Sequence, residues 1–278
     1  MNSRRYLSPD LSLRCFSISV ALSGVLLLAG CSAPPKTTKA EPPAPPQPKL
    51  ALTVRVASVD LSGYGKRIEK KDIEQLSAAL KREQIEILAV QGIARYPNVK
   101  TRVDFVNELA AQMDMRHAFG ESIDISGRQQ GNAVFSMYPI RSNQKKEYDV
   151  PSAFYESALL VSIDAGVRDV VVVSTRLPAK ATSDELAKCI RTIAGLQKIP
   201  DAPFVVAGNL PVYRKSRDFE RFTDLQSSLP GGSGKLLTSR LWFTAGDLFK
   251  LLNARAVKTE LGTLTIAEFG LYQPAHSQ

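Results

Sequence analysis

Three polar residues stand directly after apolar runs that have the pattern of β-strands. Asp60 follows ALTVRVASV, Arg176 follows VVVVST, and Asn209 follows FVVAG. A carboxylate such as Asp60 can bind a cation, whereas the Arg176 guanidinium can bind phosphate but cannot shuttle a proton near neutral pH. The Asn209 amide has no useful basicity. These side chains therefore suit the binding of ions or polar ligands better than acid/base catalysis.

Histidine and cysteine are scarce in this chain. Two histidines leave little material for His-rich metal sites or for multi-histidine acid/base chemistry. Three cysteines exclude a disulfide scaffold. Cys15 and Cys31 fall in the N-terminal segment considered below, so Cys189 is left as a single thiol, and we expect it to be buried and structural.

Strand-like and helix-like segments both occur between Ala51 and Gln278. Apolar residues at helical spacing predict helices over residues 69–82, 102–113 and 183–196. Alternating or continuous apolar runs predict strands over residues 52–59, 85–90, 131–136, 141–148, 157–164, 169–175 and 204–207, with shorter pieces near 217–226, 239–243 and 264–271. Strands that arrive both singly after helices and in hairpin-like runs favour an α/β (α+β) fold of two packed sheets flanked by helices.

The first thirty residues have the organisation of a secretory signal. The first fifteen residues contain three arginines and precede a mainly apolar run from Phe16 to Leu28. This run is too short to span a bilayer as a helix. The following LAGC, which ends at Cys31, resembles the lipobox of bacterial lipoproteins, whose cysteine is diacylated and becomes the new N-terminus. We expect residues 1–30 to be a lipoprotein signal peptide and Cys31 to anchor the chain in a membrane. The alternative is a plain signal peptide with an incidental cysteine.

Residues 31–50 have the composition of a tether. Seven of the nineteen residues from Ser32 to Leu50 are proline, which favours a solvated, semi-rigid spacer. Ser32 follows the cysteine at the position where aspartate favours retention in the inner membrane of Gram-negative bacteria. For a Gram-negative source, this implies the periplasmic face of the outer membrane. The folded domain is then expected over residues 51–278.

The basic charge of the chain is concentrated near its start. The 278 residues carry a formal charge of +9, from 36 Lys and Arg against 27 Asp and Glu. The signal segment holds three arginines and one aspartate, and the tether three lysines and one glutamate, which leaves about +5 for the domain. Nucleic acid is therefore not an expected partner. PGGSGK, over residues 230–235, does not complete a phosphate-binding GxxxxGK[ST] loop and is interpreted as a surface loop.

Seven segments of the domain form a recognisable series: VRVASVDL, EILAVQGI, GNAVFSMYPI, ESALLVSID, VVVVSTRL, FVVAGNLP and TSRLWFT. Their order and spacing resemble the endonuclease/exonuclease/phosphatase family, which includes secreted nucleases, apurinic endonucleases, inositol polyphosphate phosphatases and sphingomyelinases. GNAVFSMYPI is the strongest match. The resemblance implies a four-layer αββα sandwich, with two mixed sheets between helices, and metal-assisted hydrolysis of a phosphate ester.

The positions that carry this chemistry in the family are changed here. Gly92 stands where the family has a glutamate that helps to hold Mg²⁺, and Asp60 stands where an asparagine usually ends the first strand. Arg176 replaces a histidine that assists phosphate charge stabilisation. Asn209 replaces the aspartate that orients or activates water, and Pro211 replaces the asparagine that contacts phosphate.

The remaining motifs depart from the family in the same way. Trp242 replaces the acid of Ser-Arg-Ile-Asp, and the closing Ser-Asp-His has no counterpart in the last predicted strand. His117 corresponds to a scaffold strand of the family, and His276 lies beyond the last strand, so neither is expected to be catalytic. The resemblance places four residues at the mouth of the ancestral site, where they could bind a small anion or polar ligand: Asp60, Arg176, Asn209 and Arg240.

These replacements favour a non-catalytic binding or scaffolding protein of the cell envelope, with no cofactor. One alternative is a divergent Mg²⁺-dependent phosphodiesterase or nuclease, and another is an anion-binding module that uses Arg176. The expected partners are a membrane, contacted through lipidated Cys31, and either an envelope protein or a small anionic ligand.

Overall fold

The chain divides into two units, Met1–Ala44 and Pro45–Gln278, and only the second is described below. The structure is a computed structural model, and it describes residues 47–62, 68–97, 102–153, 156–198, 202–209, 223–224, 240–244 and 246–274. The predicted signal peptide, Cys31 and the tether up to residue 46 lie outside the described residues. Within the described ranges, the helices are all too short or too polar to cross a membrane.

The first sheet has six strands in the order β11-β12-β1-β2-β4-β3. Its strands are β1 (Lys49–Asp60), β2 (Ile87–Arg95), β3 (Arg116–Ile125), β4 (Arg128–Ser136), β11 (Phe249–Thr259) and β12 (Gly262–Gln273). Strands β1 and β2 are parallel, and all other neighbours are antiparallel. Helix α1 (Lys70–Arg82) makes the crossover from β1 to β2, so the carboxyl ends of these two strands lie at the same edge.

The second sheet repeats this arrangement. Its strands are β5 (Ile140–Glu147), β6 (Ser157–Asp164), β7 (Asp169–Arg176), β8 (Phe204–Asn209), β9 (Thr223–Asp224) and β10 (Arg240–Phe243), in the order β5-β6-β7-β8-β10-β9. Here β7 and β8 form the parallel pair, and α3 (Ser183–Ala194) makes the crossover between them. A short 3₁₀ turn, Pro151–Ala153, precedes β6.

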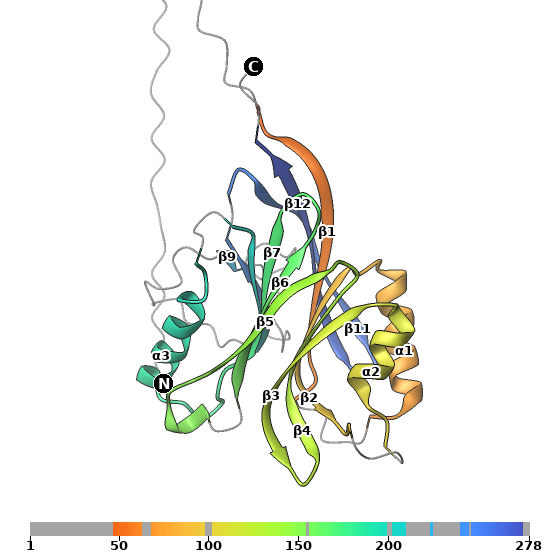
Figure 1. Cartoon of the computed structure of the whole chain (residues 1–278), viewed down its shortest axis with the longest axis vertical. Coiled ribbons are helices and arrows are strands. Elements are labelled where there is room, and N and C mark those ends of the chain that lie inside the picture. Colours follow the sequence, from red (N-terminus) through yellow and green to blue (C-terminus); the bar gives the residue numbers. More distant parts are fainter. Residues whose placement is uncertain are drawn as a thin grey trace, which may run out of the picture. The chain divides into compact units, whose positions relative to one another are not determined.

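Three apolar clusters show how the layers pack. The middle cluster fills the space between the two sheets and includes Val56, Val172 and Phe269. The first sheet is covered on its outer face by α1 and α2 (Phe105–Met113), and the second sheet by α3. Figure 1 shows α1 and α2 on one side of the two sheets and α3 on the other. The α/β prediction is therefore confirmed, with two mixed sheets between helices.

Side chains cap the start of each helix. Glu69 and Asp72 form a capping box at α1, and Thr182 and Glu185 form another at α3. Asp104 caps α2 by accepting hydrogen bonds from the backbone N–H groups of residues 106 and 107. The caps fix the first residue of each helix, and each helix begins within three residues of the start that the apolar spacing predicts.

Several strands differ from the sequence prediction: β3 has no counterpart among the strands predicted from apolar runs, and β2 extends to Arg95 instead of ending at residue 90. Strand β1 begins at Lys49, two residues before the expected start of the domain, and its Lys49 and Leu50 pair with Gln273 and Tyr272. Strand β11 has no predicted counterpart. A bulge between Leu251 and Asn253 breaks its alternation of side chains, so the period-two pattern that identifies a strand is lost.

Candidate functional site

The carboxyl ends of the two parallel strand pairs meet at Asp60 and Asn209. Asn209 Nδ2 donates a 2.9 Å hydrogen bond to Asp60 Oδ2, which joins β8 of one sheet to β1 of the other. The backbone N–H of Ser62 donates a 2.9 Å hydrogen bond to Asp60 Oδ1. Both residues are half-buried. Within the described residues, each oxygen of Asp60, the only acidic side chain among the candidate site residues, accepts one hydrogen bond.

Gly92 lies beside this pair, and the chain that follows β1 fills the space next to it. Its φ is +67°, in the left-handed region that favours glycine. A Cβ at this position would lie 2.4 Å from Ser62 Cβ and 2.7 Å from Ser62 Cα. A 2.9 Å hydrogen bond from Leu61 N to Gln91 O holds that segment in place. A side chain cannot be added at residue 92 unless this segment moves.

A buried polar bridge joins the two sheets beneath Asp60 and Asn209. The fully buried Gln91 donates through Nε2 to Ser174 Oγ at 3.1 Å and to Ala207 O at 3.4 Å. Ser58 Oγ donates to Gln91 Oε1 at 3.3 Å, and Ser174 Oγ donates to Val90 O at 3.0 Å. Buried polar groups cost free energy unless they are paired, so this network fixes the spacing of the sheets below the candidate site.

Arg176 lies next to Asn209 in the β7–β8 ladder. Its Nη1 is 3.5 Å from Glu156 Oε1, and its side chain is 27% exposed. Thr175, its neighbour, is buried and contacts the Tyr148 hydroxyl, and burial raises the pKa of Tyr148. The Arg176 charge is therefore partly offset by Glu156, and an anion that bound to Arg176 would compete with this carboxylate.

Among the described residues, the side chains around Asp60 do not fit a Mg²⁺ site. Mg²⁺ requires a near-octahedral set of oxygen ligands, usually including one or two carboxylates. Gly92 supplies no side chain at the position that holds a glutamate in the family pattern, and Asn209 directs its amide N–H toward Asp60. In the described parts of the chain, no three His, Cys, Asp or Glu side chains gather in a way that would hold a metal.

Several residues singled out in the sequence lie away from this site or outside the described residues. Trp242 is buried in the cluster beneath α3, on the outer face of its sheet, and pairs with Val206. His117, on β3, lies opposite Phe135 of β4, which in turn pairs with Leu88 near the start of β2. His117 is therefore far from the end of β2 that adjoins the candidate site. Arg240, in contrast, lies near the site, because its backbone is opposite Gly208, the residue before Asn209, in the β8–β10 ladder. Pro211, Cys31, His276 and the 230–235 segment are outside the described residues.

Asn132 belongs to the site although it was not singled out from the sequence. It is buried, its Nδ2 donates to Ser157 O at 2.8 Å, and its Oδ1 accepts from Gly92 N at 3.3 Å. The preceding Gly131 is required for close packing, because its Cβ would lie 2.0 Å from Gly120 O. The sequence signal that could have identified Asn132 is the Gly-Asn start of GNAVFSMYPI, the segment that matches the family most strongly.

Comparison with known proteins gives matches in structure but not in sequence. The sequence matches no protein-family model and no curated protein. An endonuclease/exonuclease/phosphatase from Beutenbergia cavernae matches with a TM-score of 0.61 and 14% identity, over 79% of this chain and 72% of the other. The human Nocturnin catalytic domain, solved with a bound sulfate anion, matches with a TM-score of 0.60 and 10% identity, over 82% and 97%. The domain has the endonuclease/exonuclease/phosphatase fold.

A third solved structure supports the same assignment. TDP2 from D. rerio, in complex with a single-strand DNA product, matches with a TM-score of 0.60 and 10% identity, over 78% of this chain and 98% of the other. In the endonuclease/exonuclease/phosphatase fold of the present chain, Asp60 ends β1 and Asn209 ends β8, and Gly92 lies within β2, next to the Gln91 that pairs with Asp60. The predicted fold is thus confirmed, and the function has to be argued from these residues.

Proposed function

We propose that this protein is a lipid-anchored protein of the cell envelope whose endonuclease/exonuclease/phosphatase-like domain binds or scaffolds without hydrolysing phosphate esters. The observation that carries the proposal is the packing of Ser62 against Gly92. The space that a metal-binding side chain would need at residue 92 is taken by the protein's own backbone. No metal cofactor is expected.

The second argument concerns the activation of water. At the position where the family has an aspartate, Asn209 uses its amide to donate a hydrogen bond to Asp60, and an amide cannot accept a proton from water near neutral pH. Loss of a general base typically costs about two to four orders of magnitude in rate. Loss of a metal ligand in the same catalytic unit leaves little rate enhancement to be recovered.

A hydrolysis assay tests this part of the proposal. The full-length protein in detergent is incubated with Mg²⁺ or Mn²⁺ and either DNA or an activated phosphodiester, and we expect no turnover above the protein-free blank. The divergent phosphodiesterase or nuclease hypothesis expects turnover that needs the metal and disappears in Asn209→Ala. That result would overturn the non-catalytic proposal.

The anion-binding alternative is favoured by the partial exposure of Arg176. It requires inorganic phosphate to raise the melting temperature of the wild type but not that of Arg176→Ala. The absence of a shift in the wild type removes this alternative.

Envelope anchoring rests on LAGC at Cys31 and on the proline-rich tether. We expect labelled palmitate to be incorporated into the wild type in the bacterial host and into Cys189→Ser, but not into Cys31→Ser. Cys189 is the matched control because it is buried, and burial raises its thiol pKa to about 11. Label that persists in Cys31→Ser contradicts lipid anchoring at this residue. For a Gram-negative source, the labelled protein is expected at the periplasmic face of the outer membrane.

A further inference from the structure

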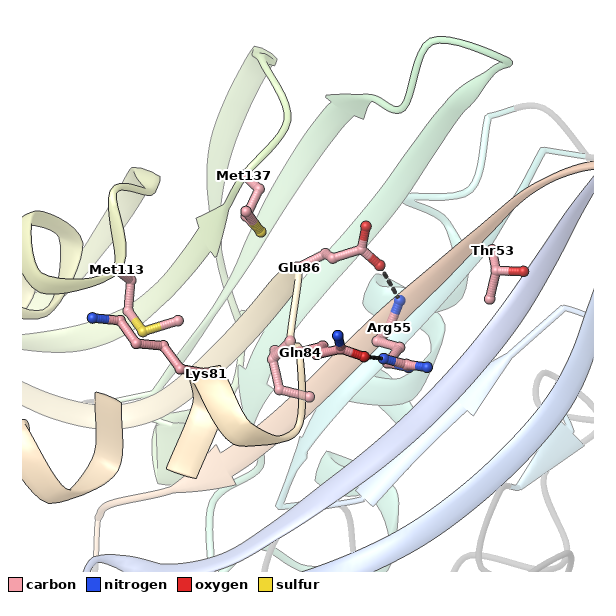
Figure 2. A pocket seen from close by; sticks show the side chains of 8 residues that line it. Thr53, Arg55, Lys81, Gln84, Glu86, Met113 and Met137 are labelled. Atoms are coloured by element: carbon pink, nitrogen blue, oxygen red, sulfur yellow. Dashed lines mark hydrogen bonds between the residues drawn. The ribbon is translucent and has the colours of Figure 1, made fainter. Parts of the chain in front are cut away.

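A pocket of about 640 Å³ lies at the end of the first sheet opposite to Asp60. The β1–β2 pairing starts where Ile87 lies opposite Val56 and runs toward Asp60 at the end of β1. The pocket adjoins the start of this pairing, and Asp60 therefore lies at the other end. The pocket is lined by Thr53, Arg55, Lys81, Gln84, Ile85, Glu86, Met113 and Met137. Figure 2 shows Lys81 and Met113 at one end of the pocket and Thr53 at the other. Its volume is in the range of ligand sites.

The pocket adjoins an open edge of β1. The Arg55 carbonyl accepts a 3.0 Å hydrogen bond from Glu86 N, and Arg55 N donates to Glu86 Oε2 at 2.8 Å, so both backbone groups of Arg55 face β2. Backbone groups two residues apart in a strand face the same side, so those of Thr53 face that side as well. Strand β2 provides no partner there, because its pairing with β1 starts only at Val56.

The polar groups around this edge are already fixed in position. Arg55 Nε donates to Glu268 Oε2 at 2.9 Å, and Arg55 Nη1 donates to Gln84 Oε1. Glu86 Oε1 accepts a 2.5 Å hydrogen bond from Tyr138, whose pKa is raised by burial, so the phenol remains a donor. A ligand would therefore meet a preorganised surface, which lowers the entropic cost of binding.

Among the described residues, the charged group of the pocket without an ion-pair or hydrogen-bond partner is the Lys81 ammonium, so the pocket has a positive charge to offer a ligand. Arg55 is paired with Glu268, and Glu86 accepts from a backbone N–H and a phenol. Lys81 has no carboxylate within ion-pair distance in the described part of the chain. Beside it, Met113 and the 53% exposed Met137 offer flexible apolar surface. An acidic side chain with an aliphatic stem complements these groups.

We propose that the open edge of β1 at Thr53 and the adjoining pocket bind an extended peptide segment that carries an acidic side chain. The peptide adds a short strand to the first sheet, its backbone pairs with the N–H and C=O of Thr53, and its acidic side chain enters the pocket toward Lys81. This inference rests on the proposed non-catalytic function, for which it supplies the class of partner.

The probe for this site is a phage-displayed library of random twelve-residue peptides, selected on the full-length protein in detergent. Selected peptides are synthesised with a fluorophore, and their affinities are compared among variants. We expect an Asp or Glu at one common position and binding weakened about tenfold or more by Thr53→Pro, which removes a backbone donor, and by Lys81→Glu. Thr53→Val keeps the backbone donor and is expected to bind within about twofold of wild type.

A second readout does not depend on the folding of any variant. Saturating peptide should slow hydrogen exchange at the Thr53 amide in the wild type, because that amide becomes a hydrogen-bond donor to the peptide. The proposal is overturned if no peptide is selected, if binding is unchanged in Lys81→Glu, or if the Thr53 amide gains no protection. None of these results affects the hydrolysis assay, so the failure of this inference is distinguishable from the failure of the proposed function.

Discussion

At Gly92, backbone conformation and steric crowding act on the same residue. The left-handed φ of +67° disfavours any residue with a Cβ, and Ser62 occupies the place of that Cβ. Gly127, in the turn between β3 and β4, has a φ of +81° with nothing within 4 Å of its added Cβ. Comparison of these two glycines separates the cost of conformation from the cost of crowding.

We expect Gly127→Ala to lower the free energy of unfolding by about 1 kcal/mol, the cost of a left-handed alanine. Gly92→Ala should lower it by about 3 kcal/mol or more, because overpacking against Ser62 adds to the same conformational cost. Urea denaturation of both variants measures the difference. Equal costs would mean that the segment after β1 yields readily, and the main observation behind the non-catalytic proposal would then be lost.

The crossover helix α3 places β8, and thereby Asn209, beside β7. Its N-terminus is held by Glu185, which accepts from Thr182 N at 2.8 Å and from Ser152 N at 3.2 Å. Hydrogen bonds from the Thr182 backbone and hydroxyl lower the pKa of Glu185 to about 2. A carboxyl whose pKa is lower in the folded state stabilises the fold above its unfolded pKa of about 4.3, and this contribution is lost as the pH falls toward 2.

The lowered pKa of Glu185 predicts how Glu185→Gln will behave, because this variant removes the negative charge but keeps a hydrogen-bond acceptor. At pH 7 the variant should melt at a lower temperature than the wild type, and the difference should shrink steadily between pH 4.5 and 2. Scanning calorimetry across this range provides the measurement. A difference that stays constant with pH would show that the ionised carboxylate does not contribute through this cap.

The elements that the sequence predicts best are those whose burial pattern is uninterrupted. The apolar patterns of β1, β7 and β8 and the helical spacing of α1 and α3 predicted these elements, and with them the strand ends that carry Asp60 and Asn209, but not which strands pair in parallel. Strand β11 was not predicted, because its bulge interrupts the alternation of inward-facing and outward-facing side chains. The sequence shows that residue 92 lacks a side chain, but the filling of its space depends on the course of the chain after β1, which no local pattern records.

At the scale of the whole molecule, burial differs sharply between the centre and the edges of the sheets. Seven of the eight side chains of the edge strand β5 are exposed, whereas most of β7 and β8 is buried. Backbone amides at exposed edges open locally, whereas those of central strands exchange mainly through global unfolding. Hydrogen exchange followed by mass spectrometry should therefore show fast exchange in β5 peptides and the slowest exchange in β7 and β8. Similar protection in all three strands would contradict this account of the packing.

The packing of Ser62 over Gly92 also limits how the site can change by mutation. A carboxylate introduced at residue 92 would first bring backbone strain and steric overlap, and it would offer a ligand only if the segment after β1 had already moved aside. The order of substitutions therefore matters: a change in the Asp60–Ser62 segment must precede one at residue 92. A metal site at this edge of the fold is separated from the present sequence by at least one intermediate that is less stable and gains no ligand.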